Sequence, residues 1–494
     1  MNNRCLIEYF SKPINALLFM VLLVLVFGMA ARTPLDADVW WHLRAGQESW
    51  QRSAPLTVDL FSYTCNQMPW NNHSWLTEII MFLMYRAGGY AGIGLFVALS
   101  VTAMTALLFI QMDEPVFIRT TLLLFAGVVS APNWSPRPQL ISFLCLALLS
   151  LLIRRVNPGK WMLWVLPGIF ILWSNLHGGY FLGLLYLGAV LTGKVISWFF
   201  DSESSPSSLT NPYIFLGGAI ILCMAAVAIN PLGIKVWSVP LETIDASVLQ
   251  FNISEWDSPN FHESNQIPFL IYLIMLVAFI ALVPEPVKLD EVLPIVGFLA
   301  MALYSRRAIA PFVVISIPLL SSRINLGWAQ VKKNWRHKFF LARNKSDNKN
   351  HRIINLSLVG VLWMAALIKL FFVTNPIFVE DKIQEMYPQN AIDVLLSTPV
   401  TGNLLNEYDW GGFLIWRAPG RLVFADGRAD LFGAEILNQW AGLVQAQPGW
   451  EQLVEKNSID TVLLYPDRPL VEVLSNQGWQ YLYRDSNAVL LRKP

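Results

Sequence analysis

The chain is dominated by continuous apolar runs of about 20 residues, the length at which a helix crosses a bilayer. Because the runs do not alternate between apolar and polar residues, they favour helical spans over a membrane β-barrel. A shorter apolar stretch at 77–88 is expected to form an interfacial helix that leads into the second span. We place eleven spans, at 13–31, 91–111, 116–132, 139–155, 161–176, 180–200, 212–230, 266–283, 291–305, 308–321 and 353–374.

The pattern changes from about residue 375, where hydrophobic runs shorten to strand length and turn residues appear. GNLLNEY, GFLIWR, RLVFADGR, TVLLYP and YLYRDSNAVLLR are typical of strands, and AEILNQWAGLVQAQ, WEQLVEKN and RPLVEVLSNQ are typical of helices. The sequence therefore predicts an α-helical polytopic membrane region at 1–374, with a long first outer loop at 32–90 and a basic loop at 322–352. A soluble external α/β domain at 375–494 is expected to follow.

Charge sets the expected orientation. Only 14% of residues are charged, against about 25% in soluble domains. Arg154, Arg155 and Lys160 lie in one short loop, and a larger basic cluster lies between 323 and 352. Because basic loops stay in the cytoplasm, the N-terminus is expected inside and residues 375–494, with 15 acidic and 9 basic residues, outside. Topology accounts for the basic loop, so we expect no nucleic-acid partner.

Most residues with chemical character then fall at the outer face, beginning with Asp36 and Asp38 in TPLDADVWWHLRAGQ. In an extended segment two carboxylates at this spacing lie about 7 Å apart on one side. They could bind a divalent cation such as Mg²⁺ or Mn²⁺, or one could act as a general base. The alternative is a polar interfacial turn anchored by the neighbouring tryptophans. His42, close behind the two aspartates, adds a titratable group of a second kind.

Three further outer segments carry candidates for substrate binding. Trp70 and His73 could stack on a sugar ring, or could belong to the aromatic belt of the membrane surface. Asn175 and His177 precede a Gly pair where a ligand could approach, although a helix cap would also explain them. Glu255 lies in the outer loop at 231–265.

Two arginine-containing motifs remain. Arg306 and Arg307 contradict the positive-inside bias, and their guanidinium forks suit a lipid phosphate or pyrophosphate. Alternatively, both side chains snorkel to the headgroups. Asp426, Arg428 and Asp430 could reach the membrane site from the external domain, or form an internal network that holds that domain together.

The stretches DADVWWHLRAGQ, PWNNHSWLTEI, RPQL, WSNLHGGYFLG and DWGGFLIWR…FADGRADLFG resemble GT-C-type membrane glycosyltransferases, in a poorly characterised bacterial group. The resemblance implies a polyprenyl-phosphate-linked sugar donor. It implies that Asp36 or Asp38 is the general base or a metal ligand. It also implies that Arg306, Arg307 and Arg137 bind the donor phosphate.

The predicted function is therefore transfer of a sugar to an acceptor at the outer, periplasmic face of the bacterial inner membrane. The expected partners are the lipid-linked donor, membrane lipids and an acceptor that is a glycan, a lipid or a protein. One alternative is a non-catalytic scaffold whose external domain binds a partner. The other is a lipid or solute transporter, which the nearly charge-free span centres and the lack of an inverted repeat disfavour.

Overall fold

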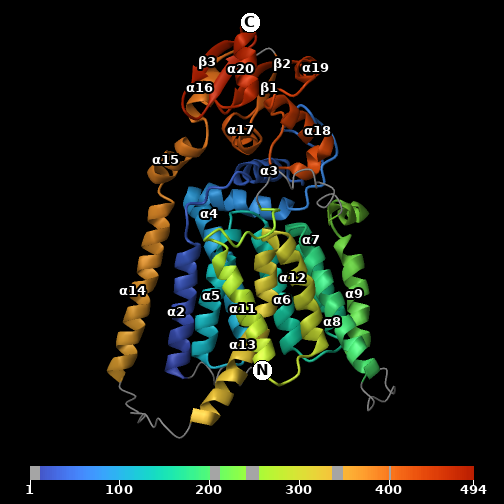
Figure 1. Cartoon of the computed structure of the whole chain (residues 1–494), viewed down its shortest axis with the longest axis vertical. Helices are drawn as coiled ribbons and strands as arrows, with labels where there is room; N and C mark the ends of the chain where they lie inside the picture. The colour runs from blue at the N-terminus through green and yellow to red at the C-terminus, as the bar shows by residue number, and fades with distance from the viewer. Residues whose placement is uncertain (1–11, 201–211, 241–254, 336–348, 400–401) are drawn as a thin grey trace.

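The computed structural model describes residues 12–200, 212–240, 255–335, 349–399 and 402–494. A bundle of long helices carries a small α/β domain at one end, which we call the domain end (Figure 1). Helix α3 (Val39–Arg52) and the first half of α4 (Trp75–Gln111) lie between the bundle and the domain. Parts of the expected outer loop (241–254) and basic loop (336–348) fall outside the described residues.

Each of the eleven predicted spans is a helix in the described part of the chain, because uninterrupted apolar residues favour a helix in which every backbone group is paired. The α-helical polytopic fold expected from the sequence is confirmed. The bundle helices are α2 (Pro13–Ala30), the second half of α4, α5 (Val116–Ser130), α6 (Gln139–Arg155), α7 (Met162–Leu176), α8 (Tyr180–Phe200), α9 (Pro212–Val227), α11 (Ile267–Leu282), α12 (Leu289–Tyr304), α13 (Ile309–Trp335) and α14 (Lys349–Val373).

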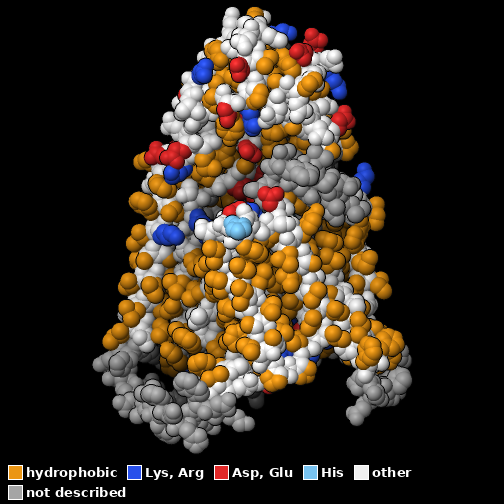
Figure 2. Space-filling view, viewed as in Figure 1, with side chains coloured by type: hydrophobic (Ala, Val, Ile, Leu, Met, Phe, Trp, Pro, Cys, Tyr) orange, Lys and Arg blue, Asp and Glu red, His pale blue; other side chains and the backbone are white. Residues whose placement is uncertain are grey.

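The surface of the bundle suits a lipid environment. Six helical segments among the described residues are long and apolar enough to cross a membrane, and α7, α9 and α11 supply shorter apolar helices. Hydrophobic side chains cover the visible face of the bundle, whereas charged side chains gather at the domain end and on the domain (Figure 2). Helix α13 lies at the centre of the bundle, and 78% of its most apolar stretch is buried. Helix α14 lies at the periphery, and only 17% of its most apolar stretch is buried.

Helix α4 changes direction at Gly89, whose φ of 56° and ψ of −138° are not helical. A side chain is strained at such a positive φ, so glycine is suited to this position. The residues before Gly89 lie across the domain end, and the residues after it run through the bundle (Figure 1). The interfacial helix expected at 77–88 therefore exists.

The α/β domain is built on a four-stranded sheet with the order β1-β2-β4-β3. Strand β1 (Asn403–Asn406) is parallel to β2 (Ile459–Leu464), and β4 (Val489–Arg492) is antiparallel to both β2 and β3 (Gln480–Arg484). The domain helices are α15 (Pro376–Met386), α16 (Gln389–Ser397), α17 (Gly411–Arg417), α18 (Ala429–Val444), α19 (Trp450–Lys456) and α20 (Pro469–Asn476).

Two of the expected strands are wrong. GFLIWR forms α17, a short helix that packs against α3. A short apolar run does not by itself distinguish a buried helix from a strand. RLVFADGR makes only an isolated parallel bridge, between Val423 and Ser62. Its backbone pairs with the first loop rather than with the sheet, so the domain is joined to that loop.

Candidate functional site

Asp36 and Asp38 lie in the connection between α2 and α3, at the domain end. Asp36 Oδ1 accepts a hydrogen bond of 2.9 Å from the Asp38 backbone N–H. Asp38 stands at the N-cap of α3, but its side chain makes no capping hydrogen bond. Instead its Oδ1 accepts a bond of 3.1 Å from Trp41 Nε1. This bond holds the Asp38 carboxylate against the side chain of Trp41 in the first turn of α3.

Arg137 brings the two aspartates together with Glu255. Its Nε lies 2.7 Å from Asp36 Oδ1, and its Nη1 lies 3.1 Å from Asp38 Oδ2 and 3.0 Å from Glu255 Oε2. Pro136 and Pro138 flank the arginine and restrict its backbone. We call Asp36, Asp38, Glu255 and Arg137 the carboxylate cluster.

The carboxylate cluster is partly exposed to solvent. Its side chains are between 11% and 37% exposed, so the carboxylates keep some contact with solvent. Burial raises the pKa of Asp38 to about 6, against the opposing attraction of Arg137. Burial alone would lower the pKa of Arg137, but Asp38, Asp36 and Glu255 raise it above its ordinary value. At neutral pH the cluster therefore holds a carboxylate with raised basicity beside a fixed cation.

Arg306 and Arg307 lie in the 3-10 helix η4 (Arg306–Ala308), where the chain passes from α12 to α13, but they face different partners. Arg306 Nη1 and Nη2 each lie 2.9 Å from a carboxylate oxygen of Glu263. Arg307 lies over the ring of Trp256 at 4.7 Å, and its Nε is 4.0 Å from Glu255 Oε2.

This difference changes what each arginine has left to bind. The Arg307 guanidinium makes no hydrogen bond to any side chain or backbone group of the described residues, and burial lowers its pKa. Arg306 already has a bidentate carboxylate partner. Of the pair, Arg307 is therefore the one with hydrogen-bond donors left for a ligand beside the carboxylate cluster, and Arg306 holds the loop that contains Glu263.

His42 lies behind the cluster and is only 6% exposed. The centroids of its ring and the Trp41 ring lie 3.5 Å apart with the planes tilted by 34°, and its Nδ1 lies 3.0 Å from Glu78 Oε1. Asn72 Nδ2 donates to Glu78 Oε2 at 2.7 Å. Burial raises the pKa of Glu78 to about 8 and lowers that of His42 well below its usual value.

Both shifts favour a neutral pair, in which a protonated Glu78 donates to Nδ1 of a neutral His42. The expected substrate contact by His42 is corrected accordingly: the imidazole is enclosed and supports Trp41, which in turn holds Asp38.

The residues His73, Asn175 and His177 form a separate group beside the loop after α7. The His73 and His177 rings lie 5.6 Å apart. The Gly179 N–H donates to His177 Nδ1 at 3.0 Å, and Ser142 Oγ lies 2.7 Å from the same atom. Since a backbone N–H can only donate, His177 Nδ1 is unprotonated and Nε2 carries the proton.

Asn175 has a structural role rather than the expected substrate contact. Its Oδ1 accepts from Trp75 Nε1 at 3.1 Å, and its Nδ2 donates to the carbonyls of Ile171 and Ile229. These bonds use both ends of the amide. Only His73 and His177 of this group retain nitrogen atoms that could contact a ligand.

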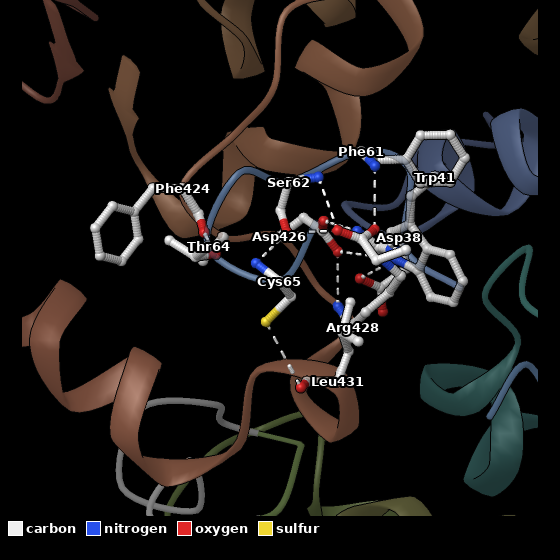
Figure 3. Close-up of polar contacts among 12 residues, drawn as sticks. Asp38, Trp41, Phe61, Ser62, Thr64, Cys65, Phe424, Asp426, Arg428 and Leu431 are labelled. Atoms are coloured by element: carbon white, nitrogen blue, oxygen red, sulfur yellow. Dashed lines mark hydrogen bonds and ion pairs between the residues drawn. The ribbon is translucent and has the colours of Figure 1, made fainter. Parts of the chain in front are cut away.

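The α/β domain reaches the cluster through FADGRAD. A Cβ placed on Gly427 would overlap Asp38 Oδ1, so any other residue here would require the carboxylate to move. One residue further, Arg428 Nη1 lies 2.7 Å from Asp59 Oδ1 and Nη2 lies 2.7 Å from Asp426 Oδ2 (Figure 3). All three side chains are fully buried. We call Asp59, Asp426 and Arg428 the domain clamp.

The domain clamp also explains Trp70, which was expected to stack on a sugar. Trp70 is 3% exposed, and the Arg428 guanidinium lies over its ring at 4.8 Å. The indole therefore packs against the clamp and offers no open face to a ligand. Thr64 Oγ1 adds a bond of 2.6 Å to the Phe424 carbonyl, which ties the first loop to the domain (Figure 3).

The described residues do not fit a divalent metal ion. No group of three or more His, Cys, Asp or Glu side chains within them is placed to hold one. The carboxylates of the cluster approach the guanidinium of Arg137, which occupies the position between them. We therefore derive no step through Mg²⁺ or Mn²⁺.

Comparison with known proteins gives the fold a name. No model of a known protein family matches the sequence, and no curated protein matches it. ArnT from Cupriavidus metallidurans, solved bound to undecaprenyl phosphate, is similar over 96% of this chain and 97% of its own, with a TM-score of 0.53 and 11% identity. The Archaeoglobus fulgidus oligosaccharyltransferase in its apo form is similar over 90% of this chain and 69% of its own, with a TM-score of 0.51 and 11% identity.

The chain has a GT-C-type fold. The fold expected from the resemblance is confirmed. At 11% identity the likeness concerns the fold alone, so any chemistry has to be argued from the side chains of this chain.

Proposed function

We propose that this protein transfers a sugar from a polyprenyl-phosphate-linked donor to an acceptor hydroxyl at the domain end of the bundle. The observation that carries the proposal is the pairing of two groups at that end. Asp38 is a partly exposed carboxylate whose pKa of about 6 suits a general base near neutral pH. Arg307, beside the same cluster, has a guanidinium without a hydrogen-bond partner among the described residues.

Asp38 and Arg307 are sufficient to handle the proton and the leaving group of the proposed reaction. Asp38 takes the proton of the acceptor hydroxyl, and the resulting oxygen attacks the anomeric carbon of the donor sugar. The bond between that carbon and the phosphate oxygen breaks, and the electron pair leaves with the polyprenyl phosphate. The leaving group needs no proton, because Arg307 stabilises its charge where it develops. Asp36 is the alternative base, and it is the more fully engaged with Arg137.

Arg137 has a second part in this proposal. Its Nε and Nη1 bind the three carboxylates, while its Nη2 makes no hydrogen bond within the described part of the chain. The free Nη2 can donate to the same phosphate. Arg306 supports the site indirectly, through the loop that its pair with Glu263 holds in place.

The donor class and the location are further parts of the proposal. Undecaprenyl phosphate is the ligand in the ArnT structure of similar fold, and it supports a polyprenyl carrier here. Arg154 and Arg155 lie at the last turn of α6, the end of the bundle away from the domain. By the positive-inside rule, the domain end faces the periplasm of a bacterial inner membrane. The acceptor there would be a glycan, a lipid or a protein.

The test is donor binding and sugar transfer by purified protein with a panel of polyprenyl-phosphate sugars. Asp38→Asn should keep donor binding and lose turnover by about 10²- to 10⁴-fold, the usual contribution of a general base. Arg307→Ala should weaken donor binding about tenfold or more, because a charge-assisted hydrogen bond is lost. Arg306→Ala should have a smaller effect than Arg307→Ala.

Arg52→Ala is the matched control, since Arg52 is an exposed arginine on α3 that contacts Glu48 at 3.4 Å. It should leave both measurements unchanged. If the folded wild-type protein bound no polyprenyl-phosphate sugar, the glycosyltransferase would be rejected. The partner-binding scaffold would then be the better account.

A further inference from the structure

The carboxylate cluster gathers acids from separate segments of the chain around a single point. Asp36 and Asp38 come from the first loop, and Glu255 comes from the segment before α11. Carboxylates that converge in this way at a site for a phosphate-linked substrate often share a divalent cation. Here the group at the centre is the Arg137 guanidinium, which contacts one oxygen of each acid at 2.7 to 3.1 Å.

The contacts of Arg137 leave no room for a metal ion at the same point. Mg²⁺ requires oxygen ligands at about 2.0–2.1 Å in near-octahedral geometry. The three oxygens are instead spaced by the longer N···O contacts of a planar guanidinium. A metal could bind all three acids only after the arginine had left.

The backbone around Arg137 opposes such a withdrawal. Proline lies on both sides of it, and its N–H bonds to the Ser135 carbonyl at 2.8 Å. The side chain is 16% exposed, so removing it from the acids would leave a largely buried charge without partners.

The charges of the surroundings lead to the same conclusion. Two arginines, Arg137 and Arg307, face the three acids, so with every group ionised the site carries about one net negative charge. Adding a divalent ion would place two positive charges next to two guanidinium groups. With Arg137 in position, a monovalent fixed cation already satisfies the acids.

We propose that Arg137 is a built-in cation that takes the position of a divalent metal, and that the site is organised without a metal ion. Its meaning for sugar transfer rests on the function proposed above: the carboxylates would be held by an arginine, and the donor phosphate would be met by Arg307 and the free Nη2 of Arg137. The claim about metal binding itself does not require turnover.

The experiment is Mn²⁺ binding by the purified full-length protein, measured by electron paramagnetic resonance with and without Arg137. The wild type should bind Mn²⁺ no better than Asp36→Asn/Asp38→Asn, and Arg52→Ala, the surface control, should bind as the wild type does. Arg137→Ala should gain one site with at least about tenfold higher affinity, because a neighbouring positive charge is gone and three carboxylates are released. Arg137→Ala/Asp36→Asn/Asp38→Asn should lose that site again.

Two outcomes would overturn the proposal. One is tight Mn²⁺ binding by the wild type that disappears in Asp36→Asn/Asp38→Asn. The other is an Arg137→Ala protein that elutes and melts as a folded protein but binds no Mn²⁺, which would mean that the acids do not form a latent metal site. Because the readout is metal binding, a failure to detect sugar transfer would leave this result standing, and the two proposals can fail separately.

Discussion

Arg137 and Arg428, in two regions of the described chain, each contact more than one carboxylate, and they differ in access to solvent. Arg137 in the carboxylate cluster contacts three carboxylates, and its side chain is 16% exposed. Arg428 in the domain clamp contacts two carboxylates, and the side chains of all three residues are 0% exposed. Arg428 is also enclosed by the rings of Trp70, Phe61 and Phe432.

The comparison shows that charge pairing does not identify a functional site. In the domain clamp every nitrogen of the guanidinium has a carboxylate partner, so nothing remains for a ligand. In the carboxylate cluster one nitrogen remains unused within the described residues, and Asp38 has a pKa of about 6. A candidate site therefore differs from a structural contact in two ways: its charged groups are exposed to solvent, and some of their hydrogen-bonding atoms have no partner in the protein.

The largest expected effect belongs to the domain clamp. Arg428→Ala leaves Asp59 and Asp426 buried without a cation, which should destabilise the protein by about 3–5 kcal/mol. A thermal melt in detergent would measure the loss. Arg417→Ala is the control, because Arg417 and its partner Asp393 are more than half exposed. Equal melting temperatures for the two variants would contradict the stabilising role of the domain clamp.

The pH dependence of turnover tests the cluster. The base must be ionised, and burial raises the pKa of Asp38 to about 6. Turnover should therefore fall about tenfold per pH unit below pH 6 and be level above it. A raised carboxyl pKa favours the protonated form in the folded state. The stability that Asp38 contributes is thus present at low pH and is lost as pH rises from 3.8 toward 6, while activity rises.

A second variant tests the same pH dependence of turnover. Asp36 raises the pKa of Asp38 by charge repulsion, so Asp36→Asn should move the midpoint to lower pH. If Asp36 were the base, this variant would abolish turnover at every pH, and the assignment of roles within the cluster would be reversed.

A substitution at Gly427 tests whether the α/β domain affects the carboxylate cluster. Gly427→Ala would push a methyl group into the Asp38 carboxylate, and we expect a loss of turnover on the order of tenfold from the displaced base. Gly442→Ala provides a helical comparison in the same domain, since its nearest neighbour is the end of a flexible glutamine side chain. Unchanged kinetics in Gly427→Ala would mean that the domain does not shape the site.

The smallest effect concerns Glu78, whose pKa is raised from 4.5 to about 8 by burial. A raised carboxyl pKa gives stability that is lost as pH rises from 4.5 to 8. About one pH unit of that loss falls between pH 7 and pH 9, or about 1 kcal/mol. Glu78→Gln should melt at a pH-independent temperature over this range. Destabilisation of Glu78→Gln already at pH 6 would instead indicate an ionised pair with His42.

The sequence predicted the spans well because a long apolar run has few alternatives to a membrane helix. It was less informative in the α/β domain. GFLIWR is short and apolar, and it becomes a helix because α3 offers it a packing surface. RLVFADGR pairs with residues more than 350 positions away, such as Thr64 with Phe424, and no local pattern encodes that contact.

For the site, the sequence supplied Asp36, Asp38, Arg137, Glu255 and Arg307, but it did not predict which of them pair. It also did not distinguish Arg306 from Arg307, because adjacent residues diverge only once η4 has formed. Asp59 and the role of Glu78 were missed. An acid in the apolar context WLTEIIMF was the available signal for Glu78, since a buried carboxyl needs a partner.

The fit of Gly427 against Asp38 has a consequence for how the protein is made. Asp38 is synthesised 389 residues before Gly427, the residue that forms the wall beside it. During insertion of the bundle the carboxylate faces an open surface, because the domain has not yet emerged from the ribosome. The nascent chain therefore enters the membrane with an incomplete carboxylate cluster. The wall beside Asp38 is present only once the segment around Gly427 has packed against the first loop.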